Sequence, residues 1–165
     1  MSSAHARIVA LLTLALALTA GGCGFHMQGA TALPAGIQKV YVSTKDELSP
    51  FAVELRRALD DAGASVAPSA GEADAVIRVT QDRTGRRVLS VSARNTPQEY
   101  QVFYAIQYSI ARGDEEAVKP QAIELTRTYS FSESDLLAKD REENILREAI
   151  ARDLAGLVLR RLESL

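Results

Sequence analysis

Residues 98–111 read QEYQVFYAIQYSIA and decide the fold, because two kinds of side chain alternate along them. Every even position from Tyr100 to Ile110 is apolar or aromatic, whereas most odd positions are polar. A period of two is typical of a β-strand with one buried face. We therefore predict a strand whose inner face carries Tyr100, Val102, Tyr104, Ile106, Tyr108 and Ile110.

Other strands are predicted on both sides of this one. A short strand with one apolar face is expected near the start of the domain, over residues 38–43. Strands over residues 75–81, 86–93 and 121–131 adjoin the central strand, with turns at 82–85, 95–97 and 113–116. Strands joined by short turns pair antiparallel, so the last four should form a meander.

Two helices are predicted around these strands. Ser49 and Pro50 suit an N-cap and the first helical position, and Gly63 suits the C-terminal end of the same helix. Apolar residues at steps of three and four between Ile145 and Leu165 predict a second helix with one buried stripe. The expected order is β-α-β-β-β-β-α.

This order predicts an α+β fold, a two-layer sandwich. Two helices packed on one face of a mixed, mostly antiparallel sheet would bury both apolar stripes. A chain of 165 residues corresponds to about one domain. We assign residues 37–165 to that single α/β domain.

The N-terminal residues have the pattern of a lipoprotein signal. Residues 1–22 contain Arg7 and a 13-residue apolar run too short to span a membrane, and they end in small residues before Cys23. An acylated Cys23 would explain the single cysteine and anchor the chain, and Gly24 after it is typical of outer-membrane sorting. An ordinary signal with a free thiol is the alternative. Residues 23–36 are expected to be a lipidated tether.

The composition narrows the classes of function. The net charge of −2, from 19 basic and 21 acidic side chains, excludes a generally basic nucleic-acid-binding protein. The mature chain has one histidine, His26, and no glycine-rich phosphate loop or metal-ligand spacing. The acidic pairs Asp60-Asp61 and Glu142-Glu143 are interpreted as solvated helix faces. We therefore expect no enzyme activity, cofactor or metal; an envelope hydrolase is disfavoured.

One local stretch is strongly basic. Residues 83–98 contain no acid and four arginines, namely Arg83, Arg86, Arg87 and Arg94. Guanidinium groups bind phosphate oxygens through paired hydrogen bonds, so this stretch indicates a site for an anionic partner. The alternative is that these arginines are solvated and paired with acids elsewhere in the chain.

Several short motifs resemble the LptE family of lipopolysaccharide-assembly lipoproteins. The junction GCGFHMQG at residues 22–29 is similar to the mature N-termini of that family. Arg94-Asn95 followed by Glu99-Tyr100-Gln101 resembles the start of its central strand. Residues 137–140, LAKD, with Glu142-Glu143 resemble the start of its last helix.

The resemblance implies a function in the outer membrane. Members of the family plug the lumen of the β-barrel LptD, help it to assemble, and with it insert lipopolysaccharide into the outer leaflet. Carried onto this sequence, Arg94 and Lys139 become the leading candidates for contacts with lipid A phosphates. From the basic stretch, Arg86 and Arg87 are expected to contribute from the adjacent hairpin. The alternative is a lipid-anchored scaffold of another envelope complex that does not bind lipopolysaccharide.

Overall fold

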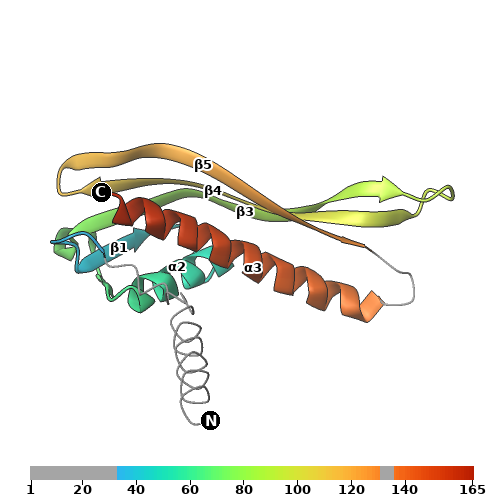
Figure 1. Cartoon of the computed structure of the whole chain (residues 1–165), viewed down its shortest axis with the longest axis horizontal. Coiled ribbons are helices and arrows are strands. Elements are labelled where there is room, and N and C mark those ends of the chain that lie inside the picture. The colour runs from blue at the N-terminus through green and yellow to red at the C-terminus, as the bar shows by residue number, and fades with distance from the viewer. Residues whose placement is uncertain (1–32, 131–135) are drawn as a thin grey trace, which may run out of the picture.

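Two helices cover one face of a five-stranded sheet in the computed structural model, which describes residues 33–130 and 136–165 (Figure 1). The predicted signal peptide, Cys23 and most of the predicted tether lie outside the described residues. The α+β class and the order β-α-β-β-β-β-α are confirmed. The elements are β1 (Lys39–Ser43), α2 (Pro50–Asp61), β2 (Ser65–Val66), a 3-10 turn η1 (Ala70–Glu72), β3 (Ala75–Val91), β4 (Pro97–Arg112), β5 (Glu115–Ser130) and α3 (Leu136–Glu163).

The sheet is mixed, with the strand order β2-β1-β3-β4-β5. β1 pairs in parallel with both β2 and β3, whereas β3, β4 and β5 are antiparallel. Asp74 fixes the start of β3 against β1, since its carboxylate accepts the backbone N–H groups of Gln38 and Lys39 at 2.8 Å each. These hydrogen bonds to the charged form lower the pKa of Asp74. The two-residue strand β2 was too short for the sequence pattern to reveal.

The inner face of β4 is the one that the alternation predicts. All six even-numbered side chains from Tyr100 to Ile110 are buried, and Tyr104 and Ile106 are each 1% exposed. The Tyr104 hydroxyl accepts a hydrogen bond of 3.2 Å from the backbone N–H of Phe51, the second residue of α2. This face therefore packs against the helices, and the tyrosines on it belong to the core.

One predicted turn is wrong: residues 82–85 lie within β3, which is continuous from Ala75 to Val91. Contacts distant in sequence hold this segment extended despite its turn-like composition. The Asp82 carboxylate accepts a 2.5 Å hydrogen bond from the Ser49 hydroxyl. Gly85 lies opposite Phe103, whose ring would be 2.8 Å from a Cβ atom at that position. The antiparallel meander therefore has three long strands, not four.

A β-bulge reverses the facing of residues along β3. Before it, Ile77 and Val79 are buried and pair with β4. The register then shifts between Val79 and Gln81, leaving Thr80 unpaired. Beyond the bulge, even-numbered residues of β3 lie opposite the inward-facing residues of β4. As a result, Arg86 is on the helix-covered face and Arg87 on the uncovered face.

Helix α2 begins and ends as its sequence predicts. The Ser49 hydroxyl accepts the backbone N–H of Ala52, and Pro50 is the first helical residue. At the other end Gly63 has a φ of 82°, and the next residue, Ala64, donates 2.9 Å back to the Leu59 carbonyl. Such an end requires a left-handed residue, which glycine adopts without strain.

Helix α3 buries a stripe that differs from the prediction at its first turns. Ile150, Leu154, Val158 and Leu162 are buried as expected. Ile145, expected in the stripe, is 60% exposed, and the nearby Glu143, expected in solvent, is buried. Asp60 and Asp61 on α2 are exposed, as predicted. Glu143 is buried because two arginines, Arg86 and Arg147, form ion pairs with it.

Strand β5 begins at Glu115, six residues before its predicted start. The turn is restricted to Gly113, with a φ of 57°, and Asp114. Pro120 is tolerated inside β5 because the strand lies at the edge of the sheet and the register shifts beside this proline.

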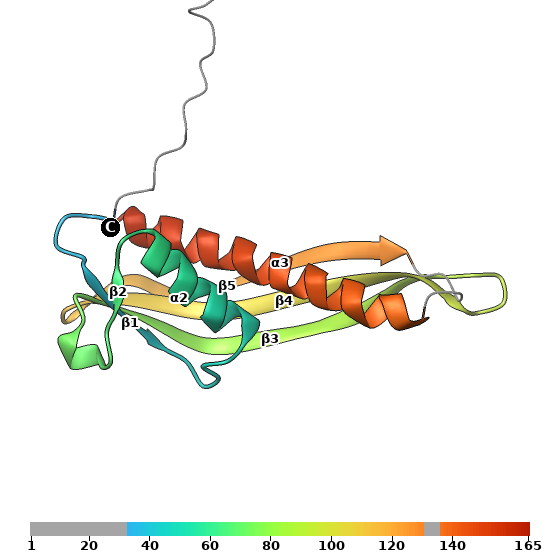
Figure 2. The ribbon, with the colours of Figure 1, turned by 90° about the horizontal axis from the view of Figure 1, so that it is seen from below.

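The connected ends of β3 and β4 extend beyond the helices as a two-stranded arm (Figures 1 and 2). We call residues 88–99 the distal hairpin. Its turn is closed by a 2.7 Å hydrogen bond from the backbone N–H of Ser92 to the Thr96 carbonyl. Because no helix covers it, Val88, Leu89 and Val91 are 51%, 49% and 53% exposed.

Candidate functional site

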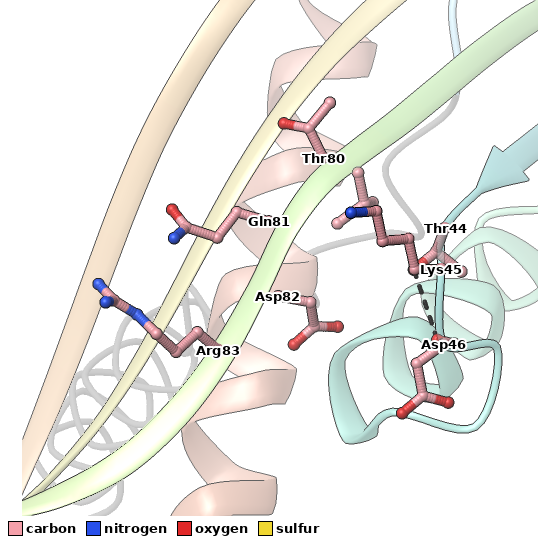
Figure 3. Close-up of a pocket in the computed structure, with 8 residues that line it drawn as sticks. Thr44, Lys45, Asp46, Thr80, Gln81, Asp82 and Arg83 are labelled. Atoms are coloured by element: carbon pink, nitrogen blue, oxygen red, sulfur yellow. Dashed lines mark hydrogen bonds between the residues drawn. The ribbon is translucent and has the colours of Figure 1, made fainter.

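A hollow of about 370 Å³ lies where β1 ends and β3 continues past it. Figure 3 shows the side chain of Asp82 facing the loop of residues 44–46, whereas Gln81 and Arg83 point away on the other side of β3. Asp82 is held by Ser49, and it also bonds the Tyr104 hydroxyl. Burial first, and then Asp82, raise the pKa of Tyr104, so its phenol stays neutral.

This hydrogen-bonded group has a structural role rather than a catalytic one. Ser49, Asp82 and Tyr104 bond to one another and to the first N–H groups of α2, which otherwise lack partners. Across residues 33–130 and 136–165, no cluster of three or more His, Cys, Asp or Glu side chains is arranged to hold a metal. Within the same residues, no helix is both apolar and long enough to cross a membrane.

The predicted basic residues divide between the two faces of the sheet. Arg86 reaches across to α3, where its Nη1 lies 3.1 Å from Oε2 of Glu143. The other carboxylate oxygen of Glu143, Oε1, is 2.6 Å from Nη2 of Arg147. Glu143 is thus bound by two guanidinium groups, which explains how a carboxylate is tolerated in a buried position. We call Arg86, Glu143 and Arg147 the ionic cluster.

Aromatic rings underlie the ionic cluster. The guanidinium carbon of Arg86 lies 5.4 Å from the centre of the Tyr100 ring, which stacks on Tyr129 at 5.6 Å. Burial raises the pKa of Tyr129, and the nearby Glu143 raises it further, so this phenol is neutral. Burial alone would lower the pKa of Arg86, but its hydrogen bond to Glu143 raises it on balance. The cluster therefore holds two cations and one anion.

Arg87 lies on the opposite face of the sheet from Arg86. Its Nη2 is 3.0 Å from Oε1 of Glu124 on β5, and its guanidinium lies 4.3 Å from the centre of the Phe103 ring. Arg83 is on the same face, 5.9 Å from that ring. The basic stretch is consequently not one continuous surface, because neighbouring residues of a strand point in opposite directions.

Arg94 is in the turn of the distal hairpin and is exposed. Its backbone N–H donates 3.2 Å to the Ser92 hydroxyl, and its side chain makes no ion pair within the described part of the chain. Lys139 is the fourth residue of α3. The start of α3 and the distal hairpin lie at the same end of the elongated molecule, in both views (Figures 1 and 2).

Sequence reasoning missed three features of this end of the molecule. These are the burial of Glu143, the participation of Arg147 and the exposure of the apolar side chains on the distal hairpin. A four-residue spacing between Glu143 and Arg147 is a recognisable helical ion pair. The contact with Arg86, 57 positions away in the chain, carries no local signal.

Comparisons with known proteins identify relatives over nearly the whole chain. The family model described as LptE, lipopolysaccharide-assembly, matches residues 37–162. The LPS-assembly lipoprotein LptE of Pectobacterium atrosepticum is 28% identical over 159 residues, which are 96% of this chain and 85% of that protein. Its namesake from Photorhabdus laumondii is 27% identical, with coverages of 96% and 86%.

Solved structures give the same result. An uncharacterized lipoprotein B from Nitrosomonas europaea superimposes with a TM-score of 0.72 at 26% identity, covering 86% of this chain and 91% of that one. The rare lipoprotein B from Shewanella oneidensis gives a TM-score of 0.67 at 25% identity, with coverages of 76% and 94%. The sequence match over the folded domain and the shared architecture establish that this chain belongs to the LptE family of lipopolysaccharide-assembly lipoproteins.

Proposed function

We propose that this protein is an outer-membrane lipoprotein that plugs the lumen of the LptD β-barrel, assists the assembly of that barrel and helps to insert lipopolysaccharide into the outer leaflet. The role is one of binding, without catalysis. Membership of the family supports the role in lipopolysaccharide assembly. Cys23 would supply the membrane anchor through its acyl chains.

The observation that carries the lipopolysaccharide-binding part is the chemistry at one end of the molecule. The distal hairpin presents half-exposed Val88, Leu89 and Val91 together with Arg94, which has no ion pair within the described residues. Lipid A combines acyl chains with phosphate groups, so it needs apolar and cationic side chains close together. Lys139, at the start of α3, would add a second cation at the same end (Figure 2).

The two remaining arginines have unequal parts in this proposal. Arg86 lies on the same face as α3 and remains 44% exposed, so it could reach a phosphate near Lys139. Arg87 points to the opposite face and is engaged by Glu124 and Phe103, so its contribution should be smaller.

The uncovered face of the sheet supports the proposed plug. Apart from Phe103 and small residues, its central part is polar, with Gln101 and Gln107 on β4 and Thr126 and Thr128 on β5. The lumen of a membrane β-barrel is polar as well, so this face suits a barrel wall better than it suits lipid. Both helices lie on the other side of the sheet (Figure 1).

The test of lipopolysaccharide binding reverses two charges, with Arg94→Asp combined with Lys139→Asp. Capture of lipopolysaccharide should fall by about tenfold or more, equivalent to about 1.4 kcal/mol, and should weaken with added salt. Lys45→Asp with Lys119→Asp is the matched control, since both lysines are exposed outside the distal hairpin and the net charge changes equally. Equal capture by both well-folded double variants would contradict the proposal.

The barrel partner and the anchor need separate tests. Affinity purification from solubilised outer membranes should recover LptD with the wild type and with the Arg94/Lys139 variant alike. Recovery of a different envelope complex, together with no lipopolysaccharide capture, would support the alternative of a lipid-anchored scaffold. Intact mass spectrometry should find acyl mass on Cys23; a free thiol on a soluble periplasmic protein would exclude the anchor.

A further inference from the structure

The ionic cluster contains more hydrogen-bond donors than its single carboxylate can accept. Each guanidinium has five N–H donors, whereas a carboxylate offers about four lone-pair positions. Arg86 occupies one oxygen of Glu143 and Arg147 the other, and Arg147 also donates 2.7 Å to Oδ1 of Asn144. The Nε–H of Arg147 is buried and has no hydrogen-bond acceptor within the described residues.

The cluster is open to solvent on the Arg86 side. The side chains of Arg86, Arg147 and Glu143 are 44%, 24% and 12% exposed, so a ligand can approach Arg86 while Glu143 lies beneath it. The stacked rings of Tyr100 and Tyr129 border the cluster with apolar surface. An anion with more oxygen atoms than a carboxylate could therefore accept hydrogen bonds from both guanidinium groups at once.

We propose that Glu143 acts as an internal anion that occupies Arg86 and Arg147, and that a phosphate monoester of an incoming ligand displaces it from both guanidinium groups. This inference rests on the proposed function, because it describes how phosphate binding at that end of the molecule is regulated. Glu143 keeps the two arginines in place when no ligand is bound, and it lowers the affinity of the site for weak anions. Arg147 becomes a ligand-binding residue, although it is not in the basic stretch.

The position of the cluster places it beside the proposed lipopolysaccharide contacts. Glu143 follows Lys139 by four residues, which is about one turn of α3. Arg86 lies on β3 just before the distal hairpin begins at Val88. A phosphate bound between Arg86 and Arg147 would thus be close to the start of α3, on the helix-covered face of the sheet.

The decisive variant is Glu143→Gln, which keeps the shape and the hydrogen-bonding capacity of the side chain but removes its charge. Binding to vesicles that contain bisphosphorylated lipid A should tighten by about tenfold. This is the change in affinity expected from the free energy of one hydrogen bond to a charged group, taken at the lower end of its range. Glu124→Gln is the matched control, because it frees Arg87 in the same way on the opposite face. Its binding should stay within about twofold of the wild type, because the freed Arg87 still points to the face of the sheet away from the proposed phosphate site.

Two further experiments identify the residues that bind the phosphate and the kind of molecule that carries it. Arg147→Gln added to Glu143→Gln should abolish the gain, and Arg147→Gln alone should weaken binding even if Glu143→Gln does not fold. Inorganic phosphate that releases the vesicles would show that the phosphate group is sufficient. Release by soluble lipid A alone would show that the phosphate must be carried by lipid. Either result is consistent with displacement of Glu143.

The result that overturns the proposal is equal binding by Glu143→Gln and the wild type, or an equal gain from Glu124→Gln, which would indicate general electrostatics. If Arg94→Asp with Lys139→Asp loses binding while Glu143→Gln gains none, only this inference fails. If neither the wild type nor Glu143→Gln binds the vesicles, the proposed lipopolysaccharide binding fails as well.

Discussion

Replacing Ile106 with alanine tests whether the inner face of β4 forms the core. Ile106 is 1% exposed and lies on the face of β4 that packs against the helices. The change removes three carbon atoms, worth about 2.4 kcal/mol at about 0.8 kcal/mol per buried methylene. A residual cavity adds to this cost, so the free energy of unfolding should fall by about 3–4 kcal/mol.

Ile145→Ala is the control, because it removes the same carbon atoms as Ile106→Ala does. Ile145 is 60% exposed on α3, so its replacement should change the free energy of unfolding by less than about 0.5 kcal/mol. Gln107→Ala, on the opposite face of β4 from Ile106, should also cost far less. The assay is urea unfolding of the mature domain followed by circular dichroism, with similar slopes for all variants. If Ile145→Ala or Gln107→Ala destabilised the protein more than Ile106→Ala did, our assignment of the buried face would be wrong.

Two further predictions concern local contacts. Gly85→Ala should destabilise the domain by about 1–3 kcal/mol, because its Cβ would be 2.8 Å from the Phe103 ring, whereas Gly71→Ala meets no atom within 4 Å and should be nearly neutral. Thermal unfolding measures the stability of the two variants. If Gly85→Ala is as stable as the wild type, the Phe103 ring moves aside without cost and our reasoning is wrong. The lowered pKa of Asp74 means that its folded form binds protons less readily than the unfolded chain, so its stabilising effect is present above about pH 4 and is lost as the pH falls further. Unfolding of Asp74→Asn between pH 3 and pH 7 should therefore depend less on pH than the wild type does; an unchanged acid profile would refute this role.

Local sequence patterns were sufficient to predict the elements whose signals lie within a few neighbouring residues. The alternation around Tyr104 and the helix end at Gly63 are local patterns, and both were predicted correctly. The continuity of β3 was not predicted, because Asp82 and Gly85 are typical turn residues until their partners are known. Those partners, Ser49 and Phe103, are contributed by other elements.

The candidate site shows the same division between local and distant information. The sequence indicated the arginines but gave the wrong environment for Glu143, because its burial depends on Arg86 from another strand. It also suggested that Arg86 and Arg87 act together. Strand geometry separates them, which already follows from the predicted strand over residues 86–93, but which of the two faces the helices depends on the bulge at Thr80.

The bulge at Thr80 decides which face of the sheet each arginine beyond it occupies. If Thr80 were paired with β4 instead of bulged, with no residue lost, every side chain beyond this point would turn to the other face of the sheet. Arg87 would then lie on the helix-covered face with Glu143, and Arg86 on the uncovered face with Glu124. In an alignment of relatives, a one-residue gap at Thr80 would therefore indicate loss of the bulge with each arginine kept on its face, whereas a relative without a gap has the same arrangement of arginines only if it keeps the bulge.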